Sequence, residues 1–161
     1  MDKVDKVIEQ WNQARPDLNV KSMSLVGRFK QITKHLEQEM TKTFVDHGLN
    51  HASFDVLATL RRSGPPFALS PNDLLATMMV TSGTMTNRID QLSKAGLVER
   101  TQNPNDARSF IISLTEKGFT TIDTAVTSHV ATQDRLTSGL TEDEHETLNK
   151  LLRKFLESFD T

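Results

Sequence analysis

The segment between residues 70 and 114 constrains the fold more than any other part of this sequence. It holds two helix patterns, over 71–77 and from about 82 to 95, with only a short interval between them. A hairpin pattern follows directly over 97–114, with a dense turn signal at 103–106. Tandem helices that are joined by a tight turn and followed by a β-hairpin predict a winged helix-turn-helix.

Residues with known positional preferences mark where these two helices begin and end. Ser70 suits the N-cap of the first helix, and Pro71 suits its first helical position. Thr81 or Ser82 can cap the second helix, and Gly96 can end it because glycine readily adopts the left-handed backbone found there. These signals support a pair of helices with a turn between them.

Further helices are predicted on both sides of this unit. Apolar residues recur every three or four positions from about 22 to 46, and a shorter run of the same kind covers 51–62. Another helix runs from about 115 to 138, and Thr141 with Glu144 forms a capping box for the last one. The apolar side chains of that last helix are Leu148, Leu151, Leu152, Phe155, Leu156 and Phe159.

The long outer helices exceed what one small winged domain needs. Their apolar faces need a partner, and the simplest partner is a second copy of the chain. The predicted fold class is therefore mainly α (α+β), a winged helix-turn-helix with long N- and C-terminal dimerisation helices. Three regions follow along the 161 residues: N-terminal helices over 1–46, a winged helix-turn-helix DNA-binding domain over 47–118, and C-terminal dimerisation helices over 119–161.

Several functional classes lack the residues that they require. Cysteine is absent, which excludes disulfides, cysteine zinc sites and thiol nucleophiles. Because no glycine-rich phosphate loop and no G-x-S-x-G elbow is present, we expect no enzyme and no cofactor, and the five histidines show no metal-site spacing. No apolar run approaches the roughly 20 residues of a membrane span, and the charged N-terminus lacks a signal peptide. A cytoplasmic protein without a membrane partner is expected.

The net charge of −2 at first argues against a nucleic-acid partner. The acidity is concentrated at the C-terminal end, where residues from Asp123 onward include eight acidic and four basic side chains. The preceding 122 residues therefore carry a net charge of +2. A basic surface outside the C-terminal end remains compatible with this distribution.

The outward face of the second helix, over 82–95, is small and polar, and it can both donate and accept hydrogen bonds. On a helical wheel Met85, Ile89 and Leu92 cluster on the opposite face. A helix of this kind fits the major groove, where Asn and Gln can bind adenine edges. We expect these residues to contact DNA: Ser82, Thr84, Thr86, Asn87, Gln91 and Lys94. The alternative is an ordinary solvated helix face.

The turn of the hairpin offers a second DNA contact. Asn105 and Arg108 lie at its tip, where they suit phosphate or minor-groove contact, and arginine is favoured in a narrow minor groove. The alternative is a plain surface turn in which Asp106 pairs with Arg108.

Three motifs resemble those of one bacterial family. Gly96-Leu97-Val98-Glu99-Arg100, Asp106-Ala107-Arg108-Ser109 and Leu114-Thr115-Glu116-Lys117-Gly118 look like the MarR family of transcription regulators. The resemblance covers nearly the whole chain. It implies a homodimer that is held by the terminal helices and places two winged helices on a palindromic operator in double-stranded DNA. Repression of transcription is the default function in that family.

A narrower resemblance points to the urate-responsive, PecS-like branch of this family. Residues 11–18, 48–50, 54–61 and 83–88 are similar to that branch, which has an extra N-terminal helix, predicted here over 4–13. Its ligand-response residues, carried over position by position, fall on Trp11, Asp55, Arg88 and Arg100. The resemblance implies a ligand-binding site in which the N-terminal region takes part, and a small anionic effector such as urate or xanthine.

The chemistry of these four residues is compatible with an anionic ligand. Arg88 lies beside the buried face of its helix, where a guanidinium could meet an anion, and the Trp11 indole can only donate a hydrogen bond. An anion near Asp55 would be repelled, and this repulsion could move the DNA-contacting helix. The alternative is that Asp55 pairs structurally with Arg88 or Arg100, while Trp11 only packs.

Two other functions compete with a ligand-released repressor. A winged helix can serve as a protein-interaction module without sequence-specific DNA binding, and a MarR-type regulator can respond to a different phenolic or aromatic ligand. RNA binding is a weaker alternative, because no stacking platform of exposed aromatic residues is visible.

Overall fold

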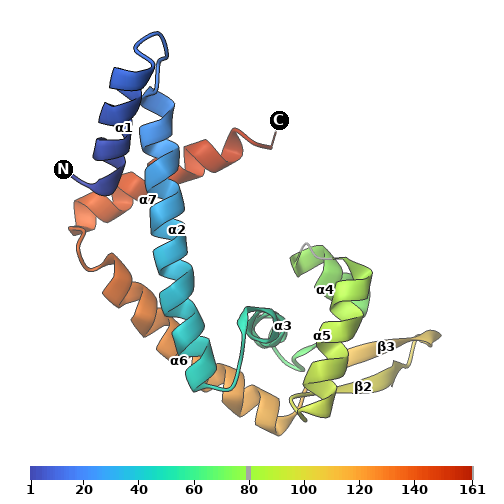
Figure 1. Cartoon of the computed structure of the whole chain (residues 1–161). Coiled ribbons are helices and arrows are strands. Elements are labelled where there is room, and N and C mark those ends of the chain that lie inside the picture. Colours follow the sequence, from blue (N-terminus) through green and yellow to red (C-terminus); the bar gives the residue numbers. More distant parts are fainter. Residues whose placement is uncertain (79–80, 161) are drawn as a thin grey trace. The chain divides into compact units, whose positions relative to one another are not determined.

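The computed structural model describes residues 1–78 and 81–160, and its elements confirm the mainly helical winged fold (Figure 1). The elements are α1 (Lys3–Ala14), α2 (Lys21–Asp46), α3 (His51–Arg62), β1 (Ala68–Leu69), α4 (Pro71–Met78), α5 (Ser82–Lys94), β2 (Val98–Asn103), β3 (Asp106–Leu114), α6 (Glu116–Thr137) and α7 (Glu142–Glu157). The chain forms two compact units, Met1–Met40 and the part from Thr41 onward. Among the described residues, no helix combines the length and the apolar character that crossing a membrane requires.

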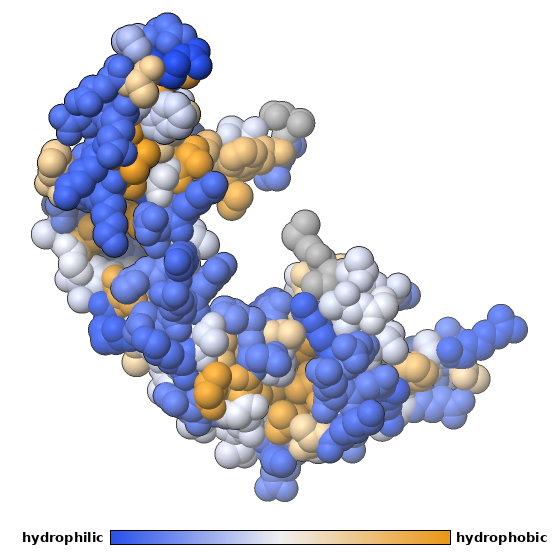
Figure 2. All heavy atoms as spheres, viewed as in Figure 1, coloured by the Kyte–Doolittle hydropathy of each residue, from blue (hydrophilic) through white to orange (hydrophobic). Residues whose placement is uncertain are grey.

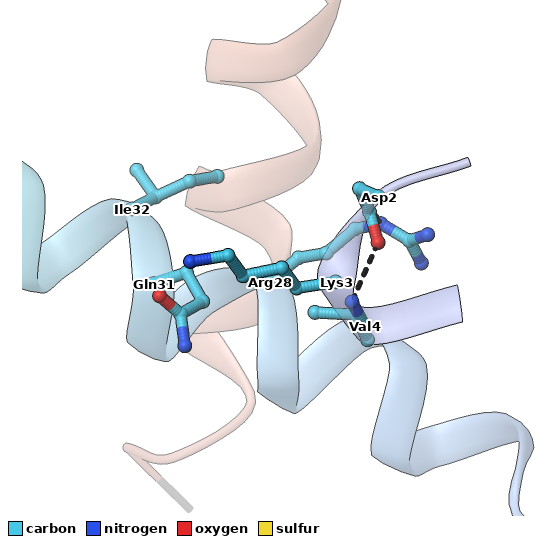
Figure 3. A pocket seen from close by; sticks show the side chains of 6 residues that line it. All are labelled: Asp2, Lys3, Val4, Arg28, Gln31 and Ile32. Atoms are coloured by element: carbon cyan, nitrogen blue, oxygen red, sulfur yellow. Dashed lines mark hydrogen bonds and ion pairs between the residues drawn. The ribbon is translucent and has the colours of Figure 1, made fainter. Parts of the chain in front are cut away.

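The first unit pairs α1 with the beginning of α2. Asp2 caps α1, and the Arg28 guanidinium of α2 contacts the carboxylates of Asp2 and Asp5 at 2.9 and 2.5 Å. Backbone hydrogen bonds within the cap and then Arg28 lower the pKa of both carboxyl groups. A Cβ on Gly27 would lie 3.1 Å from a Val4 methyl, so the two helices pack closely. A shallow groove of about 330 Å³ lies beside this contact (Figure 3).

The core of the second unit is built from its helices α3–α6 and the centre of its sheet. Helix α3 contributes Leu57 and Leu60, and α6 contributes Ile122, all fully buried. The strand order is β1-β3-β2, and all pairs are antiparallel. Ile112 on the central strand β3 is also fully buried, so the sheet packs against the helices through its centre.

Two details differ from the sequence-based expectation. The strands of the hairpin extend further than expected. Asn103 and Asp106 belong to the strands and pair across a two-residue turn, whereas the sequence indicated a turn over 103–106. The Asn103 carboxamide oxygen accepts a hydrogen bond from the Asn105 backbone N–H at 3.0 Å, which closes the turn. Phe159, expected on the last helix, lies beyond its end at Glu157.

Helix α7 leaves its apolar side open. None of its residues is buried, and its capping box of Thr141 and Glu144 is present as expected. The large apolar side chains that are exposed here are Leu148, Leu151, Leu152, Phe155, Leu156 and Phe159. Apolar surface is also visible in this region of the space-filling view (Figure 2). These side chains are between 37% and 68% exposed in the single chain.

Candidate nucleic-acid interface

Helix α5 places a polar face toward solvent because its opposite face is buried. Thr81 is its N-cap, and the Thr81 hydroxyl accepts a hydrogen bond from the Thr84 backbone N–H at 3.3 Å. Met85, Ile89 and Leu92 are buried, which fixes the rotation of the helix about its axis. The six residues predicted to contact DNA from this helix are all exposed: Ser82, Thr84, Thr86, Asn87, Gln91 and Lys94. Their contact with DNA stays a prediction.

The hairpin of β2 and β3 forms the wing. It presents Asn105 and Arg108 as exposed side chains on a turn that is braced by hydrogen bonds. The Asp106 carboxylate accepts a hydrogen bond from the Arg108 backbone N–H at 3.0 Å, and the Asn103 side chain donates to the Ser109 hydroxyl at 3.0 Å. The Arg108 guanidinium has no ion-pair partner among the described residues. Asp106 therefore holds the backbone of the turn and leaves this cation available to a phosphate.

A groove of about 480 Å³ lies between α4, α5 and the wing. Its lining includes Arg100 and Arg108 from the hairpin and Ser82 and Thr86 from α5. Asp106 also lines the groove and Arg100 is ion-paired with Asp90, so Arg108 supplies the charge that suits a negatively charged backbone.

Arg100 has a partner that the sequence did not reveal. Its guanidinium forms an ion pair with the Asp90 carboxylate of α5 and lies 5.5 Å from the centre of the Phe110 ring. The strand β2 is thereby tied to α5. The ten-residue separation across a turn gave no periodic signal for this pair, although opposite charges at the end of a helix and on the next strand were a usable hint.

Arg88 and Asp55 are half-buried, and neither side chain has an ion pair or hydrogen bond among the described residues. The alternative in which Asp55 pairs with Arg88 or Arg100 does not describe this structure, because the ion pair of Arg100 is with Asp90. Trp11 lies on α1 in the first unit and is 42% exposed, whereas the other three residues of the set belong to the second unit. A role for these four residues in ligand binding stays a prediction.

Comparison with known proteins identifies relatives of this fold and sequence. A family model described as the MarR family matches residues 49–110. The HTH-type transcriptional regulator PecS of Dickeya dadantii is 36% identical over 149 residues, which cover 92% of this chain and 90% of that protein. The multiple antibiotic resistance protein MarR of Escherichia coli is 35% identical over 65% of this chain and 72% of its own length.

Solved structures give the same result for the fold. A crystal structure of a mutant of MarR from Escherichia coli complexed with operator DNA has a TM-score of 0.72 and 26% identity, and the match covers 91% of this chain and 97% of that one. The regulator AbsC from Streptomyces coelicolor has a TM-score of 0.78 at 22% identity, with 89% of this chain and 97% of that one covered, and this likeness concerns the fold alone.

Proposed function

The chain belongs to the MarR family and is a DNA-binding transcriptional regulator, and from this premise we propose that it is a homodimeric repressor of a palindromic operator, released by a small anion such as urate. Residues 47–118 would bind DNA, and residues 1–46 and 119–161 would hold the dimer, with the ligand site involving the N-terminal part. The observation that carries the DNA-binding role is the exposed polar face of α5 beside a braced wing, whose Arg108 has no ion-pair partner in the described part of the chain.

The DNA contacts divide by their chemistry. Amide side chains such as Asn87 and Gln91 can bind adenine edges in the major groove and so distinguish sequences. Arg108 presents a charge without a partner among the described residues, and such a charge favours phosphates or a narrow minor groove whatever the sequence. A palindromic operator follows from a two-fold dimer, because each copy of α5 then meets an equivalent half-site.

A titration of the full-length protein with a fluorescent duplex from its own upstream region tests this role. We expect a preference for that duplex over a scrambled one and a steep fall in affinity with salt, because each phosphate contact releases counterions. Binding to neither duplex would refute the DNA-binding role and favour a protein-interaction module. Equal binding to both duplexes would refute sequence-specific binding to an operator in that region.

The ligand part of the proposal rests on two half-buried charges and one donor. Arg88 would hold the charge of a purine anion, and the Trp11 indole N–H would donate to a ring carbonyl. Asp55 would be repelled by the ligand, and Arg100, which is tied to α5 through Asp90, would transmit the displacement. A ligand shifts the equilibrium only by its difference in affinity for the two states, and typical coupling reduces DNA affinity roughly 5–150-fold.

Calorimetry and DNA release in the presence of urate, xanthine and a phenolic anion such as salicylate test the ligand. Trp11→Phe and Arg88→Ala should weaken urate binding, whereas Asp55→Asn should keep the binding and reduce the release. Each variant is compared with its own ligand-free affinity for DNA, because Arg88 also lies on α5. If urate and xanthine give no heat and no release from millimolar solution, the urate proposal is wrong, and a response to salicylate alone would favour an aromatic effector.

A further inference from the structure

The turn that joins α5 to the wing is held by the beginning of α6. This turn consists of Ala95, Gly96 and Leu97, and it connects the two elements to which DNA contact is assigned. Within the turn, the Gly96 and Leu97 backbone N–H groups donate to the carbonyls of Ser93 and Leu92, each at 3.0 Å. These two bonds end α5 in the way that a left-handed glycine allows, since Gly96 has φ +73°.

The three carbonyls of the turn itself accept hydrogen bonds from donors outside α5. The Ala95 carbonyl accepts from the Lys117 ammonium at 3.0 Å, and the Gly96 carbonyl accepts from the Thr115 hydroxyl at 2.7 Å. The Leu97 carbonyl accepts from the Thr115 backbone N–H at 3.2 Å. Every carbonyl of the turn is therefore bound by Thr115 or Lys117.

Thr115 is also the N-cap of α6. Its hydroxyl accepts a hydrogen bond from the Gly118 backbone N–H at 3.0 Å and so caps α6, while it donates to Gly96. The N-terminal end of α6 and the turn at the C-terminal end of α5 thus share one side chain. The ammonium of Lys117 adds a positive charge at the end of α5, where the helix dipole is negative.

We infer that Thr115 and Lys117 are positioning residues for DNA recognition, because they fix the angle between α5 and the wing by holding the turn between them. The inference rests on the proposed DNA-binding function. Sequence preference requires that α5 and the wing contact the same duplex at once, whereas nonspecific attraction to phosphates does not. Loosening the turn therefore weakens operator binding selectively.

Lys117→Met tests this role, because it keeps most of the side-chain length and removes the charged donor. Anisotropy titrations of the full-length protein compare the operator duplex with a scrambled duplex at several salt concentrations. We expect a loss of roughly two- to fivefold on the operator, the scale of one cation at a helix C-terminus. Binding to the scrambled duplex and the slope of affinity against salt should stay unchanged, and Lys117→Arg should restore most of the affinity.

Lys150→Met is the matched control, since it removes the same charge from an exposed ion pair on α7 with Glu146. It should leave operator preference unaltered. A second measurement does not depend on DNA: hydrogen exchange at the Gly96 and Leu97 amides should accelerate in Lys117→Met and not in the control.

Each contrary result has a distinct meaning. Equal loss on both duplexes, with a salt slope that is shallower by about 0.9, would show that Lys117 contacts a phosphate directly and would overturn the positioning role. Unchanged operator binding and unchanged exchange in Lys117→Met would overturn it while leaving the proposed function intact. If the wild type itself shows no preference for the operator, the proposed function fails, and the positioning role in DNA recognition fails with it, even where the exchange shows that the turn is held.

Discussion

Gly118 is the glycine with the least room for a side chain. A Cβ at this position would lie 1.9 Å from the Leu97 carbonyl oxygen, a distance that real contacts do not show. That carbonyl belongs to backbone, so the neighbour cannot swing aside as a flexible side chain would. The close approach of α6 to the turn after α5 therefore requires glycine here.

We expect Gly118→Ala to lower the free energy of unfolding by about 1–3 kcal/mol, the usual cost of overpacking. Urea denaturation of the full-length protein measures this loss. Gly83→Ala is a matched control in the first turn of α5, where a Cβ meets nothing within 4 Å. The control should be neutral or slightly stabilising, since alanine is the better helix former. Equal effects of the two substitutions would contradict the steric argument.

His129 is a second residue whose surroundings decide its chemistry. Its ring lies against those of Phe44 and Phe54, with centroids 5.2 and 4.9 Å apart. Its Nδ1 atom is buried, and no hydrogen-bond partner lies among the described residues. Burial, and then the positive charge of a protonated His51, lower the pKa of His129 below its ordinary value of 6.5.

The lowered pKa of His129 predicts that stability falls as the solution becomes acidic. Below pH 6.5 His129 binds a proton in the unfolded chain but not yet in the folded chain. Its contribution to stability is therefore complete above this pH and is lost as the pH falls toward the folded pKa. His129→Phe keeps an aromatic ring and removes the titration. Its melting temperature should fall less steeply between pH 7 and pH 5 than that of the wild type, and parallel curves would contradict the prediction.

Substitutions in α5 and in the wing should change DNA binding in different ways. Asn87→Ala and Gln91→Ala should each cost roughly 1–3 kcal/mol of discrimination against the wrong base if the side chain contacts a base edge with two hydrogen bonds. Arg108→Ala should instead weaken all duplexes alike and make the salt slope shallower by about 0.9. Titrations with operator and scrambled duplexes at several salt concentrations separate these outcomes. Identical binding profiles for Asn87→Ala and Arg108→Ala would contradict the assignment of sequence recognition to α5 and of phosphate contact to the wing.

The whole molecule leaves a large apolar surface open on α7, and a second copy is the proposed cover. Sedimentation at micromolar concentration should give about twice the chain mass of 18.1 kDa. Leu151→Glu with Phe155→Glu would place two charges on this face, where both apolar side chains are exposed in the single chain. The double variant should sediment as a monomer or lose its fold, because a buried unpaired charge costs more than the contact returns. Unaltered dimer mass in this variant would exclude α7 from the interface.

The local structure could be predicted because each signal acts within a few residues. The cap of α5 at Thr81, the capping box of Thr141 with Glu144 and the end of α5 at Gly96 all depend on hydrogen bonds between near neighbours in the chain. Spacing also placed Met85, Ile89 and Leu92 on one side, and therefore the polar face of α5 on the other. Such interactions are set by sequence order, whatever the rest of the chain does.

The tertiary structure decided which distant residues meet. The sequence offered Asp55 as a structural partner for Arg100, but the packing of β2 beside α5 brings Asp90 to it instead. The contacts of Lys117 and Thr115 with the turn after α5 likewise span about 20 residues and follow no helical or strand period. A close approach such as that of Gly118 to Leu97 exists only when two elements are docked, since it depends on their distance and angle and not on the local preferences of either.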